Sequence, residues 1–144
     1  MARRCMCLLA LGMLIGADSP SDAARKDLEK LQGEWKADKA QNDGEEAAAN
    51  LLAKMNLTVK GESLTIDVGS ARDEKAKIRL DPGKSPATID ITPARPGRAT
   101  LLGIYKLDGD SLTLCWAKKG ARPTEFASKE GSNHVLFVLR RIKN

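Results

Sequence analysis

The chain has 144 residues, 42% of them hydrophobic, with 24 Lys and Arg against 19 Asp and Glu. This length predicts a single domain, and the composition is that of a globular protein rather than a disordered one. One His and three Cys are few ligands for a conventional zinc or haem site. No cofactor and no metal are therefore expected.

The first 17 residues have the pattern of a secretory signal peptide. Arg3 and Arg4 precede an uncharged, mostly apolar run over residues 5–17. This run is shorter than the roughly 20 residues that a membrane-spanning helix needs, and it matches the apolar region of an export signal. Small residues precede an expected cleavage site after Ala23. A buried N-terminal helix and an uncleaved membrane anchor are the alternatives.

Cleavage after Ala23 would divide the chain into a signal peptide, residues 1–23, and an exported domain, residues 24–144, in the periplasm or outside the cell. Only one thiol, Cys115, would remain, so an internal disulfide is excluded. The net charge of +5 is spread along the chain. This favours a solvated surface over a nucleic-acid interface, and no stable membrane insertion is expected after cleavage.

Two short helices are expected before the strands. Leu28 and Leu31 have helical spacing within residues 21–33, and Gly33 is placed to end that helix. Residues 45–54 form the second candidate, because they begin with two glutamates and continue as an alanine- and leucine-rich run.

The remaining chain is predicted to form strands, because apolar residues then recur at every second position. Eight strands are expected, near residues 34–40, 55–60, 63–68, 75–81, 87–92, 100–107, 111–117 and 134–142. Strands joined in sequence order by short turns favour an all-β, up-and-down antiparallel barrel of about eight strands. A sandwich of two sheets is the alternative.

The clearest hairpin turns at Asp108-Gly109, a strong two-residue turn signal. This turn would pair Tyr105 with Leu112 and Gly103 with Leu114 on the inner face, and would place Cys115 on the outer face. The last strand begins with five apolar residues, so it should be covered on both faces.

Several stretches of the chain resemble, in order, a family of small exported domains that is abundant in planctomycete-type bacteria, uncharacterised and regarded as lipocalin-like. The matching stretches are residues 31–35, 87–93, 102–110, 112–116, 122–126 and 135–141. The resemblance implies a lipocalin-like barrel and export, and it implies no activity.

A more distant resemblance concerns the lipocalins themselves. Their G-x-W signature is similar to residues 33–35, Gly-Glu-Trp, which follow a short helix as in that family. The resemblance implies that Arg140 or Arg141 packs over Trp35 and closes one end of the barrel. The chain lacks the family's T-D-x-Y-D element, and its strands are short for a deep ligand cup.

No residue pattern points to catalysis. His134 is the only imidazole, and Cys115 lies between apolar neighbours with no expected cationic partner. A strand-end His and an inert core thiol are therefore the favoured interpretations. The neighbouring carboxylates Asp108 and Asp110 flank a turn glycine, and this position explains them without a catalytic dyad or a calcium loop. We expect that the protein is not an enzyme.

The candidate binding residues fall into two groups. Trp35, Tyr105, Leu114 and Trp116 are expected to point into the barrel, whereas Arg122 and Glu125 lie in the long connection before the last strand. An alternative for the second group is an Arg122–Glu125 ion pair that anchors this loop across the barrel mouth, with Phe126 as a plug.

The expected function is binding of a small apolar or amphipathic ligand in the barrel, or of an envelope protein on its surface. The alternative is a structural or protein-interaction module whose barrel is filled by side chains, a common outcome for eight strands.

Overall fold

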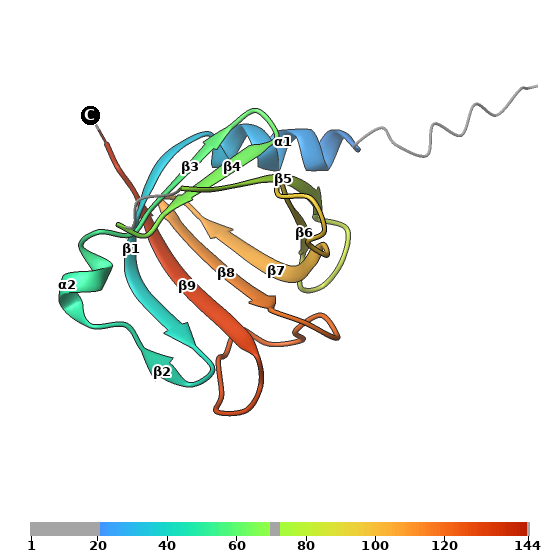
Figure 1. The fold of residues 1–144 in the computed structure, drawn as a ribbon. Helices are drawn as coiled ribbons and strands as arrows, with labels where there is room; N and C mark the ends of the chain where they lie inside the picture. The colour runs from blue at the N-terminus through green and yellow to red at the C-terminus, as the bar shows by residue number, and fades with distance from the viewer. Residues whose placement is uncertain (1–20, 70–72, 144) are drawn as a thin grey trace, which may run out of the picture.

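A closed antiparallel barrel dominates the computed structural model, which describes residues 21–69 and 73–143. Strands β1 and β3 to β9 pair in sequence order, and β1 also pairs with β9, so that the sheet closes (Figure 1). The short strand β2 pairs only with β1 within the described residues. The predicted eight-stranded lipocalin-like barrel is thus confirmed, with one extra strand and two short helices.

The strands are β1 (Gly33–Asn42), β2 (Glu45–Glu46), β3 (Asn56–Lys60), β4 (Ser63–Asp67), β5 (Glu74–Asp81), β6 (Thr88–Pro93), β7 (Leu101–Asp108), β8 (Ser111–Ala117) and β9 (His134–Arg141). Burial alternates along most of them, because successive side chains point to opposite faces of a sheet. The inward side chains form one apolar core inside the barrel.

Helix α1 (Asp22–Leu31) covers one end of the barrel (Figure 1). The Ser21 hydroxyl accepts a hydrogen bond from the Ala24 amide at 3.1 Å and caps the first turn. Ala24 and Leu31 are buried in the core. Most of the predicted signal peptide lies outside the described residues, and its last three residues form the cap and the start of this helix.

The second expected helix is present only in part, as α2 (Ala49–Leu52). Asp43 and Gly44 have positive φ angles of 54° and 88°, and they turn the chain back so that β2 pairs with the end of β1. Two positive φ angles at the centre of a two-residue loop are the requirement of a type I′ hairpin. This hairpin takes the two glutamates at 45 and 46 out of the predicted helix.

The β7–β8 hairpin also differs from its predicted register. Its loop residues are Gly109 and Asp110, so Asp108 pairs with Ser111 and Tyr105 pairs with Leu114. Gly109 has a φ of 58° at the first loop position, the place of glycine in a type II′ turn. The register is shifted by two residues, and the inner and outer faces are therefore unchanged.

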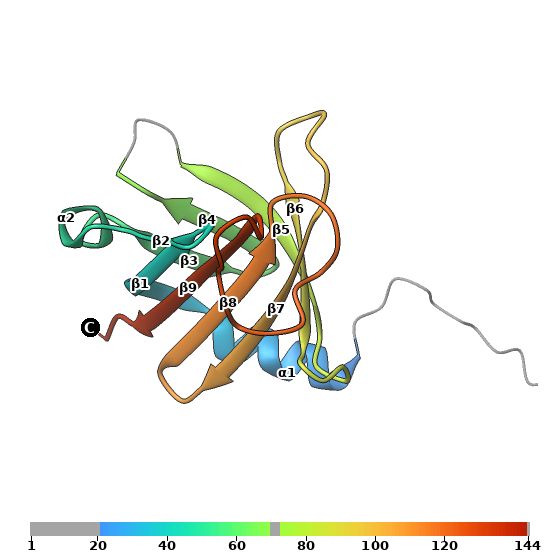
Figure 2. The same ribbon diagram turned by 90° about the horizontal axis from the view of Figure 1, so that it is seen from below.

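A second apolar cluster lies on the outside of the barrel. Ile104, Cys115 and Leu136 pack there against Phe126, which belongs to the outer connection, the segment of residues 118–133 between β8 and β9. Figure 2 shows this connection crossing the outside of the barrel. The prediction that the last strand is covered on both faces is confirmed. The prediction of Phe126 as a plug in the barrel mouth is wrong, because Phe126 packs on the outer cluster.

Candidate functional site

The interior candidates are buried where the alternation placed them. Trp35 is 0% exposed, and its indole nitrogen donates a hydrogen bond to the Leu31 carbonyl at 2.9 Å. The Arg141 guanidinium lies 4.3 Å from the centre of the Trp35 ring, a cation–π contact. The expected arginine at the barrel end is thus Arg141, whereas Arg140 pairs with Asp38 on the surface.

Side chains fill the barrel around the other interior candidates. Leu114 and Trp116 belong to the core, and the Trp116 ring packs against Phe137 at 5.0 Å between centroids. A small pocket that reaches the core beside Ala37 and Phe137 has a volume of about 10 Å³. That volume is no larger than the space for one water molecule, so it holds no organic ligand.

Tyr105 reaches from the core to the end of the barrel. Its hydroxyl donates a hydrogen bond to Asp27 on α1 at 2.6 Å. Burial and the neighbouring Asp27 carboxylate raise the pKa of Tyr105 far above its ordinary value. A neutral phenol held in this way ties α1 to the barrel.

Arg122 anchors the outer connection, but its partner is Asp90 rather than the predicted Glu125. The Arg122 guanidinium forms an ion pair with Asp90 at 2.6 Å. It also donates hydrogen bonds to the carbonyls of Ile89 and Gly103 at 3.2 and 2.7 Å. Glu125 instead forms an exposed ion pair with Lys129 at 2.9 Å. The connection crosses β7 and brings Arg122 to β6, so the two predicted partners separate.

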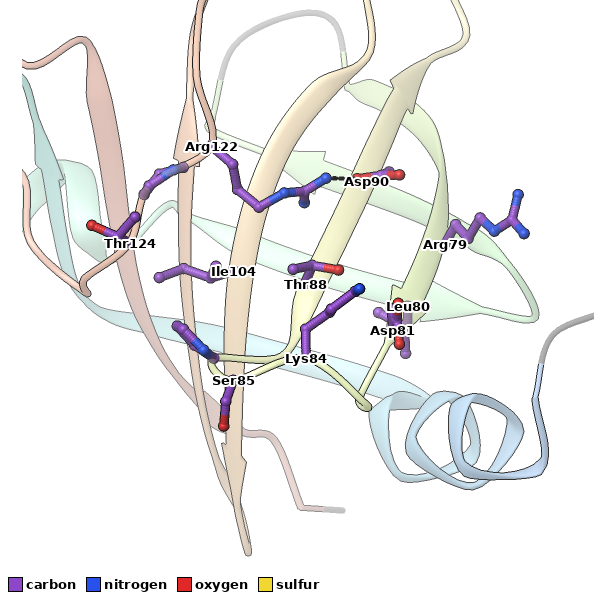
Figure 3. Close-up of a pocket in the computed structure, with 12 residues that line it drawn as sticks. Arg79, Leu80, Asp81, Lys84, Ser85, Thr88, Asp90, Ile104, Arg122 and Thr124 are labelled. Atoms are coloured by element: carbon purple, nitrogen blue, oxygen red, sulfur yellow. Dashed lines mark hydrogen bonds and ion pairs between the residues drawn. The ribbon is translucent and has the colours of Figure 1, made fainter.

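Beside Arg122 the outer surface forms a groove of about 590 Å³ between strands β5 to β7 and the start of the outer connection (Figure 3). Thr88 and Ile104, which are paired across β6 and β7, line its centre. Thr124 lines the groove from the outer connection, and Lys84 and Ser85 line it from the turn between β5 and β6.

The groove has both apolar and polar walls. Four apolar residues line it, of which Pro86 is half-buried and Leu80, Ile104 and Pro123 are buried, and the hydroxyls of Ser85, Thr88 and Thr124 lie among them. Small-molecule sites combine apolar surface with a few polar groups and have volumes of about 300–1,000 Å³. The sequence marked Arg122 but not Lys84 or Thr88, because a lysine in a turn and a threonine on a strand carry no pattern of their own.

The residues considered for catalysis have structural surroundings. Cys115 is 0% exposed, and its thiol donates to the Ala127 carbonyl at 3.5 Å. Burial raises the pKa of this thiol above its ordinary value. The His134 carbonyl accepts hydrogen bonds from Ser128 and Asp43. Asp110 pairs with Arg141 and Lys143, and these two cations lower the pKa of its carboxyl.

In residues 21–69 and 73–143, no group of three or more His, Cys, Asp or Glu side chains could hold a metal ion. Nor does that part of the chain contain a helix of the length and apolarity needed to cross a membrane. None of the protein-family models, curated proteins and solved structures matches the chain. Function is therefore inferred from the geometry of the site itself.

Proposed function

We propose that this protein is an exported, non-enzymatic binding domain, and that it binds a small amphipathic molecule in the outer groove rather than inside the barrel. One observation favours the outside of the barrel over its inside. The groove offers about 590 Å³ with mixed apolar and polar walls, whereas the small pocket beside Ala37 and Phe137 offers about 10 Å³. A ligand-binding cup would need an interior of several hundred Å³.

Export and the absence of catalysis belong to the same proposal. The signal-like pattern of residues 1–17 supports export to the periplasm or the cell exterior. The resemblance to exported lipocalin-like domains of planctomycete-type bacteria agrees with it. A non-enzymatic role is supported by the burial of the Cys115 thiol and by the ion pairs that hold Asp110.

The alternative is a protein-interaction module that binds an envelope partner and no small molecule. The filled interior supports this alternative equally well, because it removes the internal site that most favours a small ligand. The two functions differ in what occupies the groove. The spread of the charge continues to favour a non-nucleic-acid partner for both.

A thermal-shift screen of the full chain against fatty acids, sterols and quinones tests the proposal. A ligand at about 100 times its dissociation constant adds about 2.7 kcal/mol to the free energy of unfolding, which is a shift of several degrees. Thr124→Trp should obstruct the groove and abolish this shift. Ser63→Trp, on the exposed outside of β4, serves as the matched control and should retain it.

The thermal shift and its response to Thr124→Trp test both the function and the site. A shift that persists in Thr124→Trp would place the ligand elsewhere and contradict the groove. No shift with any compound would favour the interaction module.

A further inference from the structure

The residues that line the groove carry a net positive charge. Three cationic residues line it, Arg79, Lys84 and Arg122, against the two carboxylates Asp81 and Asp90. The excess of one positive charge lies in a concave surface, where potentials are stronger than on a convex one.

Both carboxylates of the groove are already engaged. Asp90 accepts the ion pair from Arg122 at 2.6 Å. Asp81 accepts a hydrogen bond from the Gly83 amide at 3.1 Å. Among the described residues, Lys84 has no ion-pair partner. The ammonium group of Lys84 is therefore available to an acidic group of a ligand.

The polar donors of the groove surround its centre. Thr88 lies between the side chains of Lys84 and Arg122 (Figure 3). A threonine hydroxyl donates one hydrogen bond and a lysine ammonium donates three. Arg122 uses three of its N–H groups on Asp90, Ile89 and Gly103, and its five donors leave two for another acceptor.

Apolar surface adjoins these donors. Pro86 is half-buried and presents its ring to the groove, whereas Ile104, which pairs with Thr88 across β6 and β7, is 1% exposed and Pro123 is buried. A molecule that places an acidic group at Thr88 therefore meets the apolar surface of Pro86 beside it.

We infer that the groove binds a small amphipathic anion, whose carboxylate or phosphate lies between Lys84 and Arg122 and whose apolar part packs against Pro86. This inference rests on the proposed function and names its ligand class. Charge-assisted hydrogen bonds from Lys84 and Thr88 would hold the acid, and the fixed Arg122 would orient it. A neutral amphiphile of the same shape cannot form these charge-assisted hydrogen bonds, so it should bind more weakly.

Isothermal titration of the full chain with octanoate, octyl phosphate and octan-1-ol tests the inference. The two acids should bind at least about tenfold more tightly than the alcohol, because hydrogen bonds to charged groups are the stronger ones. Lys84→Met should weaken both acids by about the same factor and leave octan-1-ol unchanged. Lys84→Arg should restore most of the affinity.

Lys60→Met is the matched control, because Lys60 is exposed at the end of β3 and does not line the groove. It should leave the binding of both acids unchanged. Circular dichroism of each variant verifies that the barrel is folded. A preference for octanoate or for octyl phosphate then identifies the acidic group.

The failures of the two proposals are distinguishable. If octan-1-ol binds as tightly as the acids and Thr124→Trp abolishes its binding, the anion inference is overturned while the groove remains the binding site. If Lys84→Met and Lys60→Met weaken the acids equally, general surface charge explains the effect and the inference fails. If none of the three probes binds, both proposals are overturned for this ligand class.

Discussion

Trp116→Ala is the substitution that most directly tests whether the barrel interior is filled. Trp116 is 7% exposed and packs against Phe137 with ring centroids 5.0 Å apart. Its partner across the hairpin is Gly103, which has no side chain to fill the vacated space. The substitution should therefore create a cavity that the neighbouring strand cannot close.

The magnitude follows from the burial of the ring. Truncation of a buried Phe or Trp to Ala costs about 3–5 kcal/mol of unfolding free energy, and the aromatic pair with Phe137 contributes roughly 0.5–1.5 kcal/mol of it. We expect a loss near the upper end, because Gly103 prevents collapse around the cavity. For a domain of this size the melting temperature should fall by roughly 12–20 °C. Trp116→Phe keeps most of the ring and should cost less than half as much.

Urea denaturation followed by the fluorescence of Trp35 measures both losses. Indole, which has the shape of the missing side chain, should bind the new cavity and raise the midpoint of Trp116→Ala, since dry apolar cavities accept such molecules. The wild-type chain should show no response to indole. The reverse pattern, with a wild-type response that Trp116→Ala loses, would reveal an internal ligand site and refute the filled barrel.

Other predictions concern Arg141 at the barrel end, the stability of the fold at low pH and the Cys115 thiol. Arg141→Met should cost about 2–4 kcal/mol in urea denaturation, because it loses the cation–π contact with Trp35 and hydrogen bonds to two carbonyls of the helix end. Arg140→Met removes an exposed ion pair and should cost much less, and equal losses would contradict the role of Arg141 at the barrel end. Arg140 lowers the pKa of Asp38, so this pair stabilises the fold above the ordinary carboxyl pKa of about 3.9, and the contribution is lost as pH falls through the lower folded value. In Asp38→Asn the free energy of unfolding should accordingly decline less steeply with falling pH below about pH 4. An unchanged decline would contradict a stabilising ion pair between Asp38 and Arg140. Cys115 should react with iodoacetamide at pH 8 far more slowly in the folded chain than in urea, because burial raises the pKa of the thiol and shields it; comparable rates would exclude this buried position.

The barrel itself could be predicted from the sequence because its signal is repeated in every strand. Most strands alternate apolar and polar residues, and an inner face and an outer face follow from this period whatever the register. The doubly apolar start of the last strand, Val135 to Leu139, also predicted its own cover, which the outer connection provides. The predicted register of the β7–β8 hairpin was wrong by two residues, and every side chain still lies on its predicted face.

The wrong predictions concern segments whose structure depends on contacts that the local sequence does not show. Asp43-Gly44 is a turn signal of the same kind as Asp108-Gly109, yet no second apolar strand follows it to mark a hairpin. The helical composition of the following residues was therefore the stronger pattern. Arg122 and Glu125 are close in sequence, but the partner of Arg122 is 32 residues away on β6. Pairing across that distance depends on the path of the outer connection, which has no periodicity.

The same tertiary contacts explain why the proposed site lies outside the barrel, whereas the sequence predicted a site inside it. Large inward side chains such as Trp35 and Trp116 fill the interior of a barrel whose strands have at most ten residues. The apolar outer face of β7 to β9 then needs its own cover, and the outer connection supplies it through Phe126 and the Arg122 anchor. Where that cover ends, its edge forms one wall of the groove and the β5–β6 turn forms the other. A filled barrel and an external groove are thus two consequences of one packing arrangement, and a substitution that releases Arg122 from Asp90 should change the groove without changing the core.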